Sequence, residues 1–396
     1  MRVALVSDWM SSIGGAEAYF HTLRLGLRAA GHDAALFACG PTPDPAAEYS
    51  VVDRDNRLSQ SFTQIVNPFA ARGLRAMVRD FRPDVVLTGH FAYHISPLAL
   101  DVLGDVPFVV YLMDYKTICP IGSKLLPDLS VCREDRGVIC LQKGCVSLPH
   151  WLRDRPRYAL MGRALQRASA LLTPGLSMHR QLAAAGIHTT VLRQPVPMPS
   201  AEYQRRPAPV PRFLFVGRLS REKGVPQLIA TFANVKRLHP NAELRIAGDG
   251  PLRSEIERAV AAASSGVALL GALTPAQIEA ELASAWALVA PSLWEEPFGL
   301  VALEAIVRGV PVVASNAGGF SENVVHGVTG LLVEMSDAEA LTASLTQIAS
   351  GAAFPGGHLK DSLVREARES SCPDTHVRHL MEILKRARTA TRRELH

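Results

Sequence analysis

Short apolar runs alternate along the chain with segments whose apolar positions recur every three or four residues. In the first half these runs are RVALVS, DAALFA, DVVLTG, PFVVYL, ALLTP and TTVLR. They are apolar at nearly every position, which is typical of strands buried on both faces in a parallel sheet. Several of the segments between them follow the helical period, as in residues 16–29, where Gly31 stands in the position favoured after a helix C-terminus. The pattern therefore predicts parallel strands joined by helices.

The same alternation returns in the second half, after a proline-rich stretch. The new apolar runs are RFLFVG, AELRIAG, VALLG, ALVAP, PVVAS and GLLVE. We therefore predict an α/β protein of two doubly wound domains, residues 1–194 and 212–374, joined by a linker over 195–211. A last helix, residues 375–396, is expected to complete the first domain. Ligands of such sheets bind beyond the carboxyl ends of the strands, so two facing sheets would place a cleft between the domains.

Composition and charge narrow the class of protein. The chain has 396 residues, of which 48% are hydrophobic and 20% charged, as in a folded globular protein. No stretch approaches the roughly 20 apolar residues that span a bilayer, and the N-terminal run is too short for a secretory signal. We therefore expect a cytoplasmic protein. A net charge of +5 favours an anionic ligand or membrane surface but is too weak and dispersed to indicate nucleic acid.

Two strands of the second half end in loops that suit a phosphate. In FLFVGRLSREKG, Arg218 and Lys223 follow the strand, and Gly217 and Gly224 would let the backbone approach a pyrophosphate closely. A solvated turn with a charged rim is the alternative. In LRIAGDGPL a strand runs into a glycine-rich turn at Gly248, with a proline at the expected helix start. A simple tight turn is the alternative there.

The stretch WEEPFGLVALEAIVRG, residues 294–309, combines a predicted helix start near Phe298 and Gly299 with two acids. Unpaired N–H groups at the helix start would attract an anion. Acids beside a phosphate would repel it, so Glu296 and Glu304 suit sugar hydroxyls, from which a carboxylate accepts two hydrogen bonds. Alternatively, Glu296 complements the helix dipole and Glu304 pairs with Arg308 at i,i+4.

These motifs carry a family resemblance. The pattern EEPFGLVALE, with GRLSREKG and AGDGPL before it and SNAGGFSENVVHGVTGLLV after it, resembles the retaining nucleotide-sugar glycosyltransferases of family 4. The resemblance covers nearly the whole chain and implies the GT-B fold, two Rossmann-like domains facing across a cleft. It implies transfer of a sugar from UDP or GDP to a hydroxyl of a saccharide, a lipid-linked glycan or a small-molecule glycoside. Anomeric retention without a catalytic metal or cofactor is also implied.

The resemblance further implies roles for single residues. Arg218 and Lys223 would hold the donor diphosphate, Glu296 the donor sugar and Glu304 the ribose. The glycine loop of the first half would face the diphosphate from the other domain, and the backbone around Leu270 would face the nucleobase. The implied donor-site residues are Gly14, Gly15, Arg218, Lys223, Gly248, Leu270, Gly271, Glu296, Phe298, Gly299, Leu300 and Glu304.

On the acceptor side, the resemblance points to the strand ends in TGHFAYH and MDYKTICP. It implies acceptor-side roles for His90, His94, Asp114 and Tyr115, with His90 and Asp114 also candidates for catalysis. This sequence departs from the family pattern at two places, where Gly89 and Met113 stand at positions that often hold histidine. A buried histidine with satisfied hydrogen bonds is the alternative for His90 and His94.

Two other functions remain compatible with these residues. A sugar-nucleotide 2-epimerase shares the two-domain fold, but further acids and histidines would be expected around its donor sugar. A catalytically silent nucleotide-sugar-binding protein is the second alternative, and the complete set of Arg218, Lys223, Glu296 and Glu304 argues against it. The alanine-, arginine- and proline-rich composition is typical of a bacterial chain from a GC-rich genome.

A cysteine-rich segment follows the second acceptor-side strand. Its members are Cys119, Cys132, Cys140 and Cys145. Only the last two, with four residues between them, approach the knuckle of a structural zinc site. Structural zinc, a disulfide and reduced thiols are therefore all open, and such cysteine-rich insertions recur in family members with the DYxxxCP pattern.

A basic helix is predicted directly after the cysteines, over residues 151–168. It carries five arginines and one aspartate, with aromatic and leucine residues between them. Such a helix can dock on anionic lipid, which would place the protein at the inner face of the membrane next to a lipid-linked acceptor. A helix packed on the core by one face and solvated on the other is the alternative.

Overall fold

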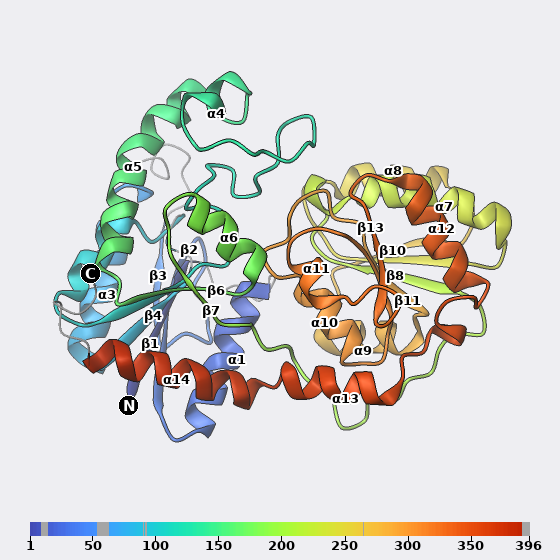
Figure 1. Cartoon of the computed structure of the whole chain (residues 1–396). Helices are drawn as coiled ribbons and strands as arrows, with labels where there is room; N and C mark the ends of the chain where they lie inside the picture. The colour runs from blue at the N-terminus through green and yellow to red at the C-terminus, as the bar shows by residue number, and fades with distance from the viewer. Residues whose placement is uncertain (9–14, 54–62, 90, 92, 264, 390–396) are drawn as a thin grey trace. The chain divides into compact units, whose positions relative to one another are not determined.

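The computed structural model describes residues 1–8, 15–53, 63–89, 91, 93–263 and 265–389 (Figure 1). The chain divides into two compact units. The first unit contains Met1–Gly122, Arg133–Pro195 and Pro373–His396, and the second contains Ser123–Cys132 and Val196–Cys372.

The first unit is built on a seven-stranded sheet in the order β3-β2-β1-β4-β5-β6-β7. All of these strand pairs are parallel, as the apolar runs predict. The edge strand β3 was not predicted because it has four residues whose side chains are alternately exposed. The strands are β1 (Arg2–Asp8), β2 (Asp33–Gly40), β3 (Tyr49–Val52), β4 (Val85–Thr88), β5 (Phe108–Tyr111), β6 (Ala170–Thr173) and β7 (Thr190–Val191).

Helices of the first unit pack on this sheet. Two of them, α1 and α14, share one buried core with β1, β2, β4 and β5, while α3 packs against β2 and β3 (Figure 1). Helix α14 contributes Val377, Leu380 and Leu384 to that core, and it begins two residues before the predicted start of the last helix. The helices are α1 (Gly15–Ala29), α3 (Pro68–Phe81), η1 (Pro97–Leu103), α4 (Val138–Gln142), α5 (Leu148–Arg167), α6 (Leu176–Ala184) and α14 (Pro373–Thr389).

The second unit is built on a six-stranded sheet in the order β10-β9-β8-β11-β12-β13, again with every pair parallel. The order runs outward from β8 to β10 and then restarts on the other side of β8 with β11. This reversal is the hallmark of a doubly wound sheet. The strands are β8 (Arg212–Val216), β9 (Glu243–Ala247), β10 (Val267–Gly271), β11 (Ala287–Ala290), β12 (Val312–Ser315) and β13 (Gly330–Val333).

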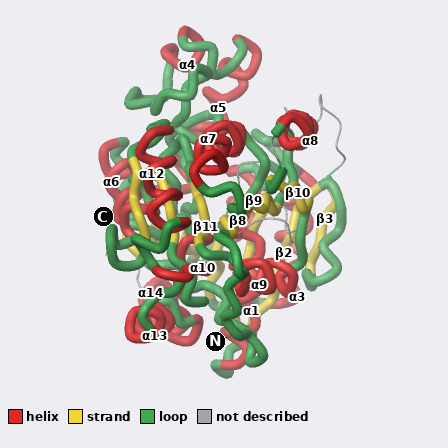
Figure 2. Tube along the Cα trace, turned by 90° about the vertical axis from the view of Figure 1, so that its right-hand side faces the viewer, coloured by secondary structure: helices red, strands yellow, loops and turns green. Residues whose placement is uncertain are grey.

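Successive residues of β8 point to opposite faces of this sheet, and each face has its own core. Phe213 and Phe215 pack with α7, α8 and α12, whereas Leu214 packs with α9, α10 and α13 (Figure 2). Burial on both faces explains why these strands are apolar at nearly every position. The helices are η2 (Arg221–Lys223), α7 (Val225–Leu238), α8 (Arg253–Ala262), α9 (Pro275–Ser284), α10 (Leu300–Ile306), α11 (Gly319–Asn323), α12 (Ala338–Ala349), η3 (Pro355–Gly357) and α13 (Asp361–Ser370).

The proline-rich stretch at 196–211 is bonded along the second unit. The Tyr203 hydroxyl donates to the carbonyl oxygen of Arg308 at 2.9 Å, and the Trp286 indole donates to the carbonyl oxygen of Ala208 at 2.8 Å. The guanidinium of Arg205 donates to four main-chain carbonyl oxygens, those of Leu282, Ala283, Gly309 and Gly357. This part of the stretch is therefore fixed to one unit rather than extended as a free spacer.

Candidate functional site

The candidate site of the second unit lies where its strand order reverses, at the adjacent ends of β8 and β11. Ligands of doubly wound sheets bind outside the carboxyl ends of the strands at this reversal. The loop after β8 spans residues 217–224 and the loop after β11 spans 291–299. Arg218, Lys223 and Glu296, which the sequence predicts as site residues, all lie on these two loops.

Glu296 is held by two donors from these loops. The Lys223 ammonium lies 2.5 Å from Oε1 of Glu296, and the Ser292 hydroxyl donates to the same oxygen at 2.8 Å. The Lys223 ammonium also lies 5.4 Å from the centre of the Trp294 ring. Glu296 is only 5% exposed, so water screens the ion pair little. An ammonium carries three N–H donors, so Lys223 can serve Glu296 and a second acceptor together.

Two of the predicted glycines are required by contacts between the loops themselves. A Cβ on Gly224 would lie 2.1 Å from the carbonyl oxygen of Pro291, and its φ of +69° is left-handed. A Cβ on Gly248, after β9, would lie 1.8 Å from the carbonyl oxygen of Gly217. The backbones of neighbouring loops therefore touch at these points, and a side chain would force them apart. The sequence attributes the close approach at Gly224 to a phosphate, whereas the structure shows that the neighbouring loop accounts for it.

Glu304 does not pair with Arg308, so this alternative is wrong. The guanidinium of Arg308 forms an ion pair with Glu279 at 2.9 Å and donates to the main-chain carbonyl oxygen of Glu304. Within the described residues, the Glu304 carboxylate has no hydrogen-bond or ion-pair partner. Burial raises its pKa above the ordinary value, and Arg308 opposes that rise. A half-buried carboxylate without a partner is costly unless a ligand satisfies it.

The helix that follows Glu296 is shorter than the sequence predicts. Helix α10 begins at Leu300 and has seven residues, because Gly299 before it has a left-handed φ of +75°. Phe298 lies outside the helix and packs its side chain in a small buried cluster. The helix therefore begins one residue after the predicted start near Phe298 and Gly299. Similarly, α8 begins at Arg253, two residues after the proline that was expected to start it.

The other predicted donor-site positions lie at neighbouring strand ends. Leu270 and Gly271 end β10, and the Gly248 amide donates to the carbonyl oxygen of Gly271 at 2.8 Å. Arg218 is exposed, and its guanidinium has no hydrogen-bond or ion-pair partner in the part of the chain that the structure describes. The reversal point of the second unit thus combines a sheltered ion pair with a cation and a carboxylate that have no partner among the described residues.

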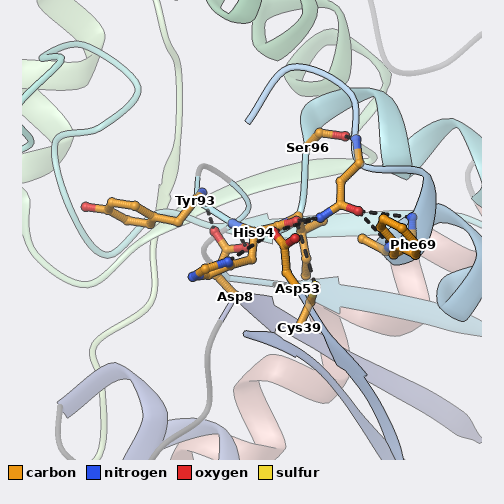
Figure 3. A network of polar contacts seen from close by, with 10 residues as sticks. Asp8, Cys39, Asp53, Phe69, Tyr93, His94 and Ser96 are labelled. Carbon is orange, nitrogen blue, oxygen red and sulfur yellow. Dashed lines mark hydrogen bonds and ion pairs between the residues drawn. The ribbon is translucent and has the colours of Figure 1, made fainter. Parts of the chain in front are cut away.

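The first unit has a buried polar network at its own reversal point, between β1 and β4 (Figure 3). Asp8, the last residue of β1, accepts main-chain N–H groups of Tyr93 at 2.7 Å and His94 at 2.9 Å, and also that of Ile95. Burial raises the pKa of the Asp8 carboxyl, and the three N–H donors offset part of that rise. Asp8 therefore ties the loop that follows β4 to the end of β1.

His94 is connected to this network through its ring and its carbonyl group. Its Nδ1 lies 3.3 Å from Oδ2 of Asp53, and its carbonyl oxygen accepts from the Asn67 side chain at 2.6 Å. Asn67 also donates to Asp53 at 3.2 Å and caps α3. Asp53 opens an Asp-x-Asp sequence, whose second member, Asp55, lies outside the described residues. The sequence predicted His94 but not its partners, which come from distant segments.

Asp114 and Tyr115 follow β5 and lie in different environments. Asp114 is half-buried and accepts the amide of Lys116 at 2.9 Å. Tyr115 is fully buried, and its hydroxyl accepts from the Gln181 side chain at 3.2 Å. Burial lowers the pKa of Lys116, whose ammonium lies 4.8 Å from the centre of the Tyr93 ring. Of the other predicted residues of this unit, Gly15 begins α1, whereas Gly14 and His90 lie outside the described residues.

The sequence of each unit matches a family model. Residues 202–369 match the model for "Glycosyl transferases group 1", and residues 13–196 match the model for "Glycosyltransferase Family 4". The chain is a glycosyltransferase of the GT-B type. The two matches together cover most of this glycosyltransferase, and they meet at the proline-rich stretch.

Known proteins resemble the glycosyltransferase along most of their length. The glycogen synthase of Mycobacterium tuberculosis is 29% identical over 391 residues, which cover 88% of this chain and 86% of that protein. The sucrose-phosphate synthase of Thermosynechococcus elongatus aligns with a TM-score of 0.73 at 20% identity, covering 99% of this chain and 100% of the other. Anabaena HepE in complex with UDP-glucose aligns with a TM-score of 0.69 at 20% identity, covering 97% and 100%. The predicted GT-B fold is therefore confirmed.

The four cysteines of the glycosyltransferase differ in burial. Cys119 and Cys140 are buried, and Cys132 and Cys145 are half-buried. Among the described residues, no group of three or more His, Cys, Asp or Glu side chains is arranged to hold a metal ion. The structural zinc stays a prediction, which metal analysis of the purified protein would test. Less than one zinc per chain, with no reloading on addition of zinc, would exclude it.

The basic helix of the glycosyltransferase is α5, which begins three residues before its predicted start. One face is buried and contains Asp154, Arg157 and Met161. Arg157 is 2% exposed, and its Nε lies 3.4 Å from Oδ1 of Asp154. Two exposed residues, Leu152 and Arg155, lie on the solvated side. No helix in the described ranges is long and apolar enough to cross a membrane.

Proposed function

We propose that this glycosyltransferase transfers a sugar from a nucleoside diphosphate to an acceptor hydroxyl, with retention of anomeric configuration. The donor is a UDP- or GDP-sugar, and the acceptor hydroxyl belongs to a saccharide, a lipid-linked glycan or a small-molecule glycoside. The complex of Anabaena HepE with UDP-glucose supports a nucleotide-sugar donor. The basic face of α5 would allow contact with the inner face of the membrane.

The observation that carries this proposal is the arrangement of charges at the reversal point of the second unit. Arg218 and Lys223 offer N–H donors to a diphosphate, while the carboxylates of Glu296 and Glu304 suit the hydroxyls of the sugar and the ribose. Lys223, which we assign to the diphosphate, and Glu296, which we assign to the sugar, form an ion pair. The phosphate-binding and sugar-binding parts of the site therefore lie next to each other. A donor with a diphosphate between two polyol groups matches this order of charges.

The proposed reaction follows from the charges that develop in it. The bond between the anomeric carbon and the diphosphate oxygen breaks, and the acceptor oxygen bonds to the same face of the anomeric carbon. The departing diphosphate gains negative charge and takes the acceptor proton. Arg218 and Lys223 stabilise that charge, so we propose that no catalytic metal is needed. Glu296 fixes the sugar ring by its hydroxyls while positive charge develops at the anomeric carbon.

The acceptor-side candidates come from the first unit. His94 is oriented by Asp53, and the loop that carries it is held by Asp8. Asp114 at the end of β5 is the second candidate, since a half-buried carboxylate can accept a hydrogen bond from an acceptor hydroxyl. Replacing His94 with Phe should raise the KM for the acceptor more than the KM for the donor.

The proposal is tested by measuring sugar transfer and donor hydrolysis with a panel of UDP- and GDP-sugars. Glu296→Gln should lower kcat by roughly 10²–10³-fold with the preferred donor, because it removes a charge from the site at nearly constant volume. Glu304→Gln should mainly raise the KM for the donor. The matched control is Glu281→Gln, which breaks the Arg245–Glu281 ion pair of 2.6 Å elsewhere in the second unit and should leave transfer unchanged.

Other outcomes would overturn parts of the proposal. Equal activity of wild type and Glu296→Gln would remove the site, and an inverted anomeric centre in the product would remove retention. Loss of activity with EDTA, restored by a divalent cation, would refute metal independence. An epimerised nucleotide sugar formed without acceptor would favour the isomerase alternative.

A further inference from the structure

A pocket of about 490 Å³ lies in the first unit, outside the residues already assigned a role in transfer. Its lining residues belong to α4, the turn after it, α5 and the segment that precedes α4. Helix α4 packs against α5 (Figure 1). Its volume is in the range of small-molecule sites. The pocket contains neither the charged residues at the reversal point of the second unit nor the polar network around Asp8 and His94.

Two arginines line this pocket, and each is held over an aromatic ring. The guanidinium of Arg136 lies 4.3 Å from the centre of the Tyr158 ring, and that of Arg155 lies 5.1 Å from the centre of the Trp151 ring. Arg136 also donates to the carbonyl oxygen of Thr117 at 3.1 Å. Within the described residues, no carboxylate pairs with either arginine. A stacked guanidinium keeps its N–H edge available for a phosphate or carboxylate.

The Asp154 carboxylate, which lines the pocket, already forms ion pairs with two other arginines. Asp154 is 5% exposed, and its Oδ1 accepts from Arg153 at 2.8 Å and lies 3.4 Å from Nε of Arg157. These two arginines compensate its charge, so it does not offset the charge of Arg136 and Arg155. The pocket therefore carries a net positive charge that favours an anionic ligand.

The remaining lining of the pocket is largely apolar. Val138, Cys140 and Val146 come from α4 and the turn after it, and Pro120 and Ala159 add to them. Val138 is 54% exposed, so apolar surface of the pocket is open to a ligand. An inorganic anion would use the arginines but leave this surface in water.

We propose that the pocket binds an anionic amphiphile, a molecule with one phosphate group joined to an apolar chain. Arg136 and Arg155 bind the phosphate, and Val138, Cys140 and Val146 contact the chain. The proposal depends on this pocket alone and not on the proposed transfer reaction, since binding requires no donor. A negative result in the binding experiment would therefore not contradict the proposed transfer reaction, and a negative result in the transfer assay would not contradict the binding proposal.

The experiment is isothermal titration of the full chain with decyl phosphate below its critical micelle concentration. We expect one molecule per chain, and weaker binding of both inorganic phosphate and decanol. Arg155→Gln should weaken binding about ten-fold, and Arg136→Gln with Arg155→Gln should weaken it further, because charge-assisted hydrogen bonds are lost. Val138→Asp tests the apolar part and should also weaken binding by about ten-fold. The matched control is Arg163→Gln, an exposed arginine of α5 outside the pocket, which should bind normally.

Several results would overturn the proposal. Unchanged affinity of the Arg136→Gln, Arg155→Gln double variant would exclude the arginines, and the single Arg155→Gln variant decides if the double variant does not fold. Equal affinity for inorganic phosphate and decyl phosphate would exclude the apolar part. An equal loss with Arg163→Gln would indicate general surface charge. Binding only to vesicles of anionic lipid, and not to monomeric decyl phosphate, would assign this region to membrane contact instead.

Discussion

A buried neutral histidine makes the stability of the first unit depend on pH. Nδ1 of His376 in α14 lies 2.8 Å from the carbonyl oxygen of Arg193, and its Nε2 lies 2.8 Å from the Tyr19 hydroxyl. Because a carbonyl oxygen only accepts, Nδ1 carries the proton and Nε2 accepts from Tyr19. Burial lowers the pKa of His376 to about 4, against roughly 6.5 for an unperturbed histidine.

The sign of the effect follows from proton uptake. Between pH 6.5 and 4 the unfolded chain binds a proton at His376 that the folded chain does not, so the free energy of unfolding falls as the pH falls. The stabilisation is fully present above pH 6.5. The loss is about 2 kcal/mol between pH 7 and pH 5, and it reaches about 3 kcal/mol at pH 4.

The assay is urea unfolding of wild type and His376→Gln at pH 7 and pH 5. Pulsed deuterium labelling of peptides from β1 and α14 reports on the first unit alone. The variant should be less stable at pH 7, but it should lose about 2 kcal/mol less than wild type between the two pH values. His188→Gln, an exposed histidine of the first unit, should keep the wild-type pH dependence. An equal loss in wild type and His376→Gln would refute the reasoning.

Three further substitutions test other parts of the structure. Arg205→Ala removes a donor from each of several main-chain carbonyl oxygens and should cost the second unit about 2–4 kcal/mol in urea unfolding. Arg206→Ala, exposed next to it, should cost less than about 0.5 kcal/mol. Gly318→Ala would place a Cβ 2.3 Å from the carbonyl oxygen of Glu296, at a backbone φ of +57°. Because this contact would displace Glu296, kcat should fall on the order of 10²-fold. An unchanged kcat would contradict the close packing of Gly318 against Glu296. Asp8→Asn turns an amide N–H toward main-chain donors and should destabilise the first unit by about 2 kcal/mol in the same labelling assay.

Sequence patterns predicted the fold because most strands of both sheets are buried on both faces. The strand that was not predicted is β3, whose short, half-exposed sequence gives no continuous apolar run. Candidate site residues could be placed at the sheet edge where they follow a buried strand directly, as Arg218 does. Contacts between segments that are distant in the sequence could not be predicted, which is why the partners of His94 were missed. The i,i+4 rule likewise failed for Arg308, because Glu279, 29 positions away, lies close enough to compete for its guanidinium.

The position of α14 has a consequence for how the protein is made. Helix α14 lies near the end of the chain, yet Val377, Leu380 and Leu384 belong to a core whose strands begin at Arg2. The apolar face that they cover stays open during synthesis until they have been translated. The second unit lies almost entirely between these two parts, so it can fold before the first unit is complete. Folding would then run against the order of translation, with a nascent hydrophobic surface available to chaperones or to aggregation in the meantime.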